Sequence, residues 1–155
     1  MDVRREGLEF KQRPGSGSSS KSPRSAWESM GIDTQRGIEA VKRGLSIRHL
    51  ETFLDVTQLP KMGVLKVLKL TVGDFQKRVA GRRLTPLESE RLWRLAKVYK
   101  KSLDLFEGNT AQATLWLKTP QRALHGDSPL RCTATEPGAS EVEELIGRIE
   151  YGVLA

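Results

Sequence analysis

The chain has 155 residues, of which 26 are basic and 19 acidic, so its formal net charge at pH 7 is +7. No apolar run reaches the roughly 20 residues that a membrane-spanning helix needs, and the N-terminus lacks the apolar core of a secretory signal. Cys132 is the only cysteine, which excludes an internal disulfide and a cysteine-rich metal site. These features are typical of a soluble cytoplasmic protein that needs no cofactor and binds no membrane.

Positive charge is concentrated in one part of the sequence. Residues 1–107 hold 22 basic and 13 acidic side chains, whereas residues 108–155 hold 4 and 6. Residues 58–101 alone hold 12 basic and 3 acidic side chains. Clustered cations release condensed counterions from a nucleic acid and so favour binding to it. A solvated helix face that is merely basic has the same composition, and charge alone does not separate the two.

Residues 1–25 are predicted to form a disordered basic arm. They contain Arg4-Arg5, a run of Gly and Ser after Pro14, and almost no apolar side chains that could offset the entropy of ordering. A start codon placed too far upstream would give the same texture, and the sequence does not decide between the two.

From about residue 26 the sequence predicts a succession of helices. Asp33-Thr34 can cap a helix that runs through Val41 and ends at Gly44, and Ser46 can cap a second one. The second helix and the one after Pro60 carry apolar residues at the spacing of a buried face. These are Ile47, Leu50, Phe53 and Leu54 in the one, and Met62, Val64, Leu65 and Leu68 in the other.

Two further helices follow in the same half of the chain. A short one is expected over residues 74–80, with Thr71 as its cap and Gly81 at its end, and with Phe75 and Val79 facing the core. Thr85-Pro86-Leu87-Glu88 then supplies a capping hydroxyl, a first-position proline and a glutamate three residues after the cap. The helix that it opens has an apolar stripe formed by Leu92, Leu95, Ala96, Tyr99, Leu103 and Phe106.

The last part of the chain predicts three more helices. One starts at Asn109, and a short one opens at Ser128-Pro129. The final helix is expected after Gly138, with Ser140 and Glu143 as its capping box. Its buried stripe consists of Val142, Leu145, Ile146 and Ile149.

The fold class that these patterns predict is all-α, because no segment alternates with the period of a strand. The two short helices between Lys61 and Ala80 are joined by about four residues that include a glycine, the outline of a helix-turn-helix. In such a motif the second helix enters the major groove, where Gln reads adenine and Lys or Arg reads guanine or phosphate. The candidate DNA-binding residues are Thr71, Gly73, Asp74, Gln76, Lys77, Arg78, Arg82 and Arg83. An ordinary helical hairpin with a basic surface has the same outline.

Two stretches resemble the Xre/MbcA/ParS family of antitoxins. Residues 64–96 are similar to the Xre-type helix-turn-helix, above all in the run G-R-R-L-T-P-L-E-S-E-R at residues 81–91. Residues 108–155 carry fixed residues at the spacing of the family's toxin-binding domain. These are Trp116-Leu117, Thr119-Pro120, Ala123-Leu124, Gly126, Pro129, Gly138, Arg148-Ile149 and Tyr151-Gly152.

The resemblance implies a helix-turn-helix DNA-binding domain over residues 26–107 and a small helical toxin-binding domain over residues 108–155. The expected protein is a type II antitoxin that neutralises a RES-domain toxin, a class that degrades NAD, by placing its C-terminal end at the toxin's active site. It would also repress its own operon by binding operator DNA, as a homodimer within a larger complex. The implied toxin-binding residues are Trp116, Pro120, Leu124, Gly126, Pro129, Arg148, Tyr151, Gly152, Val153, Leu154 and Ala155.

Other readings of the same residues stay open. A stand-alone helix-turn-helix regulator with a C-terminal dimerisation domain would show the same basic block. An enzyme is disfavoured, because His49 and His125 are the only histidines and no P-loop, nucleophile elbow or metal-ligand spacing occurs. A large aromatic such as Trp116 is more often a core residue than a contact, and residues 153–155 fit an unimportant tail as well as a plug.

Overall fold

The computed structural model describes residues 35–152, and this part of the chain is all-α, as predicted, without a β-strand. None of the helices within it is long and apolar enough to cross a membrane. In chain order the elements are α4 (Gln35–Arg43), α5 (Ile47–Thr57), α6 (Lys61–Leu68), α7 (Val72–Gly81), α8 (Pro86–Leu105), α9 (Thr110–Lys118), the 3-10 helix η2 (Arg122–Leu124), α10 (Pro129–Cys132) and α11 (Glu136–Glu150). The predicted basic arm, the Asp33-Thr34 cap and residues 153–155 lie outside the described residues.

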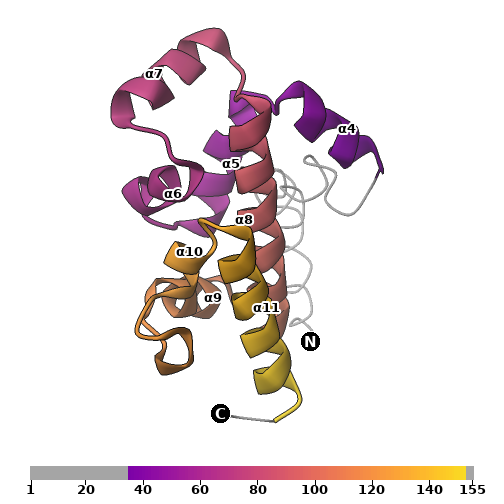
Figure 1. Cartoon of the computed structure of the whole chain (residues 1–155), viewed down its shortest axis with the longest axis vertical. Coiled ribbons are helices and arrows are strands. Elements are labelled where there is room, and N and C mark those ends of the chain that lie inside the picture. The colour runs from indigo at the N-terminus through magenta and orange to yellow at the C-terminus, as the bar shows by residue number, and fades with distance from the viewer. Residues whose placement is uncertain (1–34, 153–155) are drawn as a thin grey trace, which may run out of the picture.

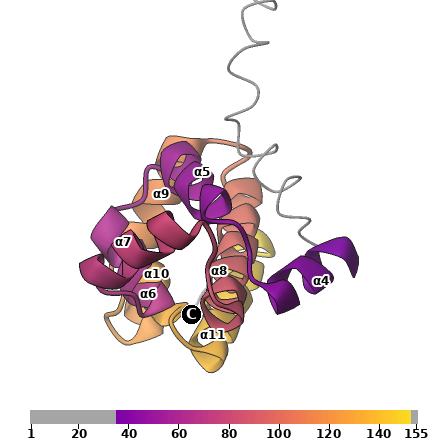
Figure 2. The same ribbon diagram turned by 90° about the horizontal axis from the view of Figure 1, so that it is seen from above.

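The long helix α8 is the support of the fold, since α4, α6, α9 and α11 all pack against it. Figure 1 shows α8 along the long axis of the molecule, with α7 at one end and the C-terminal end of α11 at the other. Seen from above, α4 stands off to one side of the other helices (Figure 2). The two ends of the molecule therefore belong to different halves of the sequence.

One apolar core joins those two halves, because buried residues from Leu45 to Ile146 form a single cluster. Within it the rings of Phe53 and Tyr99 pack edge to face, with 6.0 Å between their centroids. The hydroxyl of Thr114 donates to the carbonyl of Thr57 at 2.6 Å, so at its 3.0 Å contact with the Tyr99 hydroxyl it is the acceptor. This buried polar chain ties α5, α8 and α9 together.

Most of the predicted helix starts are confirmed. Each capping side chain accepts a hydrogen bond from a backbone N–H two or three residues further along, which satisfies a donor that the helix itself leaves free. The confirmed N-caps are Ser46, Thr71, Thr85, Asn109 and Ser128. At α8 the capping box is complete, because Glu88 also accepts from the backbone of Thr85 at 3.0 Å.

The predicted start of the last helix is wrong. Its N-cap is Thr135, whose hydroxyl accepts from the backbone of Gly138 at 3.1 Å, and Ser140 lies inside the helix. Pro137 in the first turn favours this earlier start. Gly138 is needed for a close approach: a side chain at this position would overlap the carbonyl oxygen of Cys132. A glycine expected to precede the helix therefore lies in its first turn and allows that turn to pack against α10.

Two side chains predicted to be buried are exposed. Met62 is 52% exposed, because α6 turns Val64, Leu65, Val67 and Leu68 inward instead. Val79 is 40% exposed, because α7 packs against the core only through the partly buried Phe75. Helix α7 begins at Val72, directly after the predicted cap Thr71 and two residues before the expected range.

Candidate functional site

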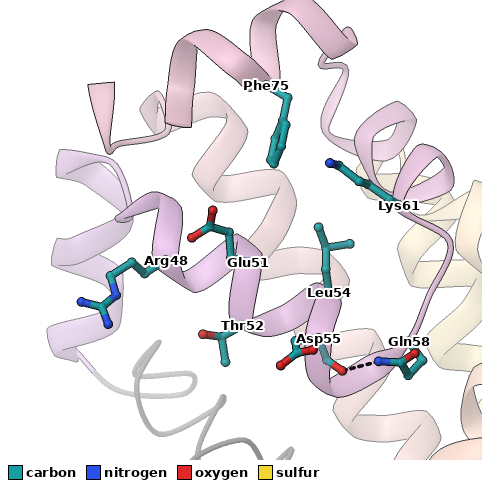
Figure 3. A pocket seen from close by; sticks show the side chains of 8 residues that line it. All are labelled: Arg48, Glu51, Thr52, Leu54, Asp55, Gln58, Lys61 and Phe75. Atoms are coloured by element: carbon teal, nitrogen blue, oxygen red, sulfur yellow. Dashed lines mark hydrogen bonds between the residues drawn. The ribbon is translucent and has the colours of Figure 1, made fainter. Parts of the chain in front are cut away.

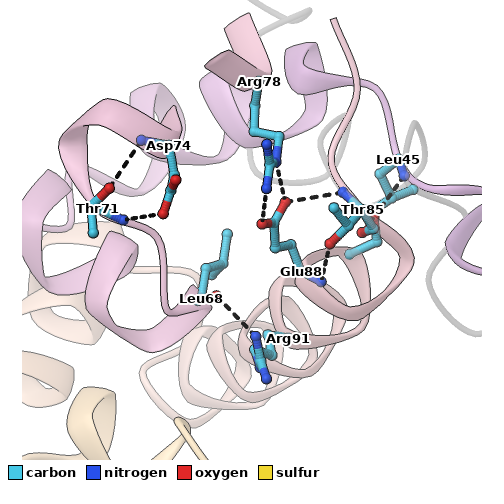
Figure 4. A network of polar contacts seen from close by, with 9 residues as sticks. Leu45, Leu68, Thr71, Asp74, Arg78, Thr85, Glu88 and Arg91 are labelled. Carbon is cyan, nitrogen blue, oxygen red and sulfur yellow. Dashed lines mark hydrogen bonds and ion pairs between the residues drawn. The ribbon is translucent and has the colours of Figure 1, made fainter. Parts of the chain in front are cut away.

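The first turn of α7 is held by a capping box between Thr71 and Asp74 (Figure 4). The Thr71 hydroxyl accepts from the backbone of Asp74 at 3.0 Å, and the Asp74 carboxylate accepts from the backbone of Thr71 at 3.2 Å. Hydrogen bonds from the backbone and the hydroxyl of Thr71 hold the pKa of Asp74 below its ordinary value. These two predicted DNA-binding side chains are therefore engaged in starting the helix.

The outer face of α7 is free. Gly73, Gln76 and Lys77 are exposed, and no residue of this helix is fully buried. On the inner face Phe75 points toward α5, and the ammonium of Lys61 lies 4.2 Å from the centroid of its ring (Figure 3). Helix α7 thus exposes glycine, glutamine and lysine on one side and makes its apolar contact with the core through Phe75 on the other.

Arg78 does not share that free face. Its Nε and Nη2 donate to the two oxygens of Glu88, each at 2.8 Å, and its side chain is 26% exposed (Figure 4). Burial alone would raise the pKa of the Glu88 carboxyl, but the hydrogen bonds from Arg78 and Thr85 outweigh it and lower the pKa. The side chains of Glu88 and Arg78 therefore form a bidentate ion pair between α7 and the first turn of α8.

The loop after α7 separates the two remaining predicted arginines. Arg82 is exposed and ends the helix in the left-handed region, with φ of 64°. Nη1 of Arg83 donates to the carbonyl of Gly44 at 2.5 Å, beside the isolated bridge between Ser46 and Arg83. The exposed basic residues of α6, α7 and the loops that follow these two helices are Lys61, Lys66, Lys69, Lys77, Arg82 and Arg83.

The predicted toxin-binding residues divide into buried and exposed ones. Leu124 and Pro129 are buried, and Trp116 is half-buried with its ring centroid 6.3 Å from that of Phe106. These three stabilise the module from inside. Pro120, Gly126, Tyr151 and Gly152 are exposed, whereas Arg148 is partly buried, and Val153, Leu154 and Ala155 lie outside the described residues.

The most exposed large apolar side chain of residues 108–152 follows the C-terminal end of α11. Tyr151 is 83% exposed, and with Glu144, Gly147 and Arg148 it lines a shallow hollow of about 350 Å³. Nε of Arg148 is buried and has no hydrogen-bond partner among residues 35–152. The surface of this hollow is apolar, which suits a partner that brings apolar surface of its own.

Two surface features were not predicted from the sequence. Leu115 is 61% exposed on α9, next to Trp116. A groove of about 560 Å³ lies between α4 and the start of α8, lined mainly by apolar side chains that include the exposed Ile38 and Leu87. The apolar positions were visible in the sequence, but only the packing shows which of them remain uncovered.

Comparisons with known proteins match residues 102–152 to the family described as the antitoxin Xre/MbcA/ParS C-terminal toxin-binding domain. A protein named Antitoxin Xre from Yersinia enterocolitica is 33% identical over 136 residues, which are 85% of this chain and 92% of that protein. Antitoxin Xre from Photorhabdus laumondii is 29% identical over 133 residues, 83% of this chain and 90% of that protein. Antitoxin Xre from Pseudomonas putida is 33% identical over 69 residues, 44% of this chain and 43% of that protein. Because the Yersinia match extends over most of both sequences, this chain belongs to the Xre family of antitoxins.

Proposed function

We propose that this antitoxin binds and neutralises a RES-domain toxin that degrades NAD, with its C-terminal end blocking the toxin's active site. We further propose that α6 and α7 form a helix-turn-helix through which the protein represses its own operon. The observation that carries the toxin-binding half is the match of residues 102–152 to a toxin-binding domain, which ends beside the exposed Tyr151.

The surface that meets the toxin must be larger than the tail. A nanomolar complex requires about −12 kcal/mol of net binding free energy, more than residues 151–155 can supply after the cost of ordering them. The apolar stripe of α11 cannot contribute, because Val142, Leu145 and Ile146 are buried in the protein's own core. We therefore assign the anchoring contacts to the hollow beside Arg148 and to the exposed Leu115.

The DNA-binding half rests on the placement of charge and of α7. Helices α6 and α7 are joined by residues 69–71, and α7 turns Gln76 and Lys77 outward among exposed lysines. Gln76 suits adenine in the major groove, and Lys77 suits phosphate or guanine. Because helix-turn-helix proteins commonly read paired half-sites, we infer that a homodimer binds the operator.

The toxin-binding half is tested by deleting residues 151–155 and co-expressing the variant with the RES-domain toxin of the same operon. We expect growth protection to be lost, while co-purification of the two proteins weakens less, because the anchoring surface remains. Gln76→Ala, on the opposite end of the molecule, is the control and should protect fully. Full protection by the truncated protein would contradict the blocking role of the tail.

The DNA-binding half is tested by measuring affinity for the operator and for random DNA at two salt concentrations. Lys77→Ala should weaken binding to both DNAs and lower the salt slope by about 1, as expected for one lost phosphate contact. Gln76→Ala should weaken operator binding alone, by about 1–3 kcal/mol. If neither variant loses affinity at either salt concentration, α7 is not part of the DNA interface.

A further inference from the structure

Helix α7 is attached to the rest of the protein by very little apolar surface. None of its residues is fully buried, and Val72 and Val79 are 49% and 40% exposed. Phe75 is its one side chain packed against the core, under the ammonium of Lys61. A single ring can keep a helix near a surface, but the helix can still pivot about that contact. The angle of α7 must therefore be fixed by something other than burial.

Contacts from the first turns of α8 fix the angle of α7. Glu88 accepts both guanidinium bonds of Arg78, and its own position is set by the capping box with Thr85. On the same turns, the Ser89 hydroxyl accepts from the backbone of Leu45 at 2.7 Å, and Arg91 donates to the carbonyl of Leu68 at 3.2 Å (Figure 4). Three nearby residues of α8 thus hold α7, the segment before α5 and the end of α6.

We propose that Arg78 and Glu88 are positioning residues that fix the angle at which α7 presents Gln76 and Lys77 to DNA, and that Arg78 itself contacts no DNA. The proposal rests on the DNA-binding function proposed above. Two parallel hydrogen bonds from a planar guanidinium constrain rotation as well as distance, which a single ammonium does not. Glu88 is suited to be the fixed partner, because its side chain is only 9% exposed and belongs to the helix that supports the fold.

The charge of Glu88 makes it possible to distinguish a positioning role from a direct electrostatic effect on DNA binding. Glu88 neutralises Arg78, so the pair offers little net positive charge to a phosphate. Removing the charge of Glu88 makes this end of the protein more positive, which by electrostatics alone would strengthen binding to any DNA. A positioning role predicts the opposite for the operator, because α7 would then present its side chains at the wrong angle. The direction of the change therefore distinguishes the two.

The test compares Glu88→Gln with Glu90→Gln in the full chain, by the ratio of affinities for operator and random DNA. Glutamine still serves in a capping box, so Glu88→Gln keeps the start of α8 but loses the ion pair. We expect its ratio to fall by about tenfold, the scale of losing one base contact. Glu90 is exposed on the same helix, and its substitution makes the same change in charge, so its ratio should stay at the wild-type value.

Two variants of Arg78 complete the experiment. Arg78→Lys keeps the charge and leaves Glu88 in its capping box, yet it should lower the ratio as Glu88→Gln does. Arg78→Ala should lower it without changing the salt slope, and the double variant with Glu88→Gln should be no worse than either single one. Thermal unfolding and growth protection report whether each variant is folded. If Glu88→Gln does not fold, Arg78→Lys provides the test of the positioning role.

Two results would overturn the positioning role alone. One is an unchanged or higher ratio in folded Glu88→Gln or Arg78→Lys. The other is an Arg78→Ala variant that weakens binding to both DNAs equally with a salt slope lower by about 1, which would make Arg78 a phosphate contact. A wild-type protein that does not discriminate the operator from random DNA would instead overturn the DNA-binding function, and the positioning role with it.

Discussion

Helices α7 and α11 lie at different ends of the molecule and are held in place by different forces. Helix α7 buries no residue completely and is oriented by the Thr71–Asp74 capping box and the Arg78–Glu88 pair. Helix α11 buries Ala139, Val142, Leu145 and Ile146. Directional polar contacts leave almost the whole surface of α7 available to a partner. One side of α11 is packed into the core, so only its C-terminal end and its outer side are accessible to a partner.

The largest effect is expected in the core of α11. Leu145→Ala should lower the free energy of unfolding by about 2–5 kcal/mol, because it leaves a cavity among buried side chains. Denaturant unfolding measures the loss. Leu115→Ala, at a position that is 61% exposed, is the matched control and should change stability by less than about 0.5 kcal/mol. Equal losses in the two variants would show that burial does not hold α11.

The start of α11 should also be sensitive to added volume. Gly138→Ala should destabilise the protein by about 1–3 kcal/mol, because its methyl group would overlap the backbone of α10. Gly147 lies in the same helix with open space at its Cβ, so Gly147→Ala should stabilise by about 0.5–1 kcal/mol. Denaturant midpoints of the two variants measure the contrast. A Gly138→Ala protein as stable as wild type would mean that a methyl group fits between the first turn of α11 and the carbonyl of Cys132.

A smaller loss is expected when the polar attachment of α7 is cut. Arg78→Ala should lower the free energy of unfolding by about 1–2 kcal/mol, because it leaves the nearly buried Glu88 carboxylate without its cation. Solvent screening of the partly exposed guanidinium keeps the loss at this level. Val79→Ala, on the exposed side of the same helix, should lose less. A comparable loss for Val79→Ala would indicate that α7 is held by apolar contact after all.

The smallest expected effect is on how the free energy of unfolding depends on pH. The pKa of Glu88 and that of Asp74 are lowered in the folded protein, so both carboxylates stabilise it above their unfolded pKa of about 4. That contribution is lost as the pH falls through the lower, folded pKa values. Glu88→Gln should therefore be less stable than wild type at pH 6, and the difference should shrink toward pH 3. Unfolding curves at pH 6, 4 and 3 measure this, and a constant difference would contradict the ion pair.

Local chemistry made much of the fold predictable. Capping side chains act within three residues, so the starts of α5, α8, α9 and α10 could be predicted directly from the sequence. The start of α11 could not, because Gly138 is required by the backbone of Cys132 in another helix. The exposure of Val79 likewise depends on how far α7 stands from the core.

The site was harder to predict than the fold, because its side chains have partners elsewhere in the chain. Glu88 fits a local capping box in the sequence, and nothing in that pattern shows that the same carboxylate also binds Arg78. The family resemblance marks Leu124 and Pro129 beside Tyr151, although the first two are buried and only the third is open to a partner. Spacing that matches a family does not by itself separate buried residues, which support a surface, from exposed residues, which can contact a partner.

We propose that one core carries two separable binding ends, α7 for DNA and the end of α11 for the toxin (Figure 1). The most direct test measures growth protection and operator discrimination for the same two folded variants, the deletion of residues 151–155 and Glu88→Gln. We expect the deletion to lose protection and keep operator discrimination, and Glu88→Gln to do the reverse. Loss of both functions in either folded variant would contradict the claim.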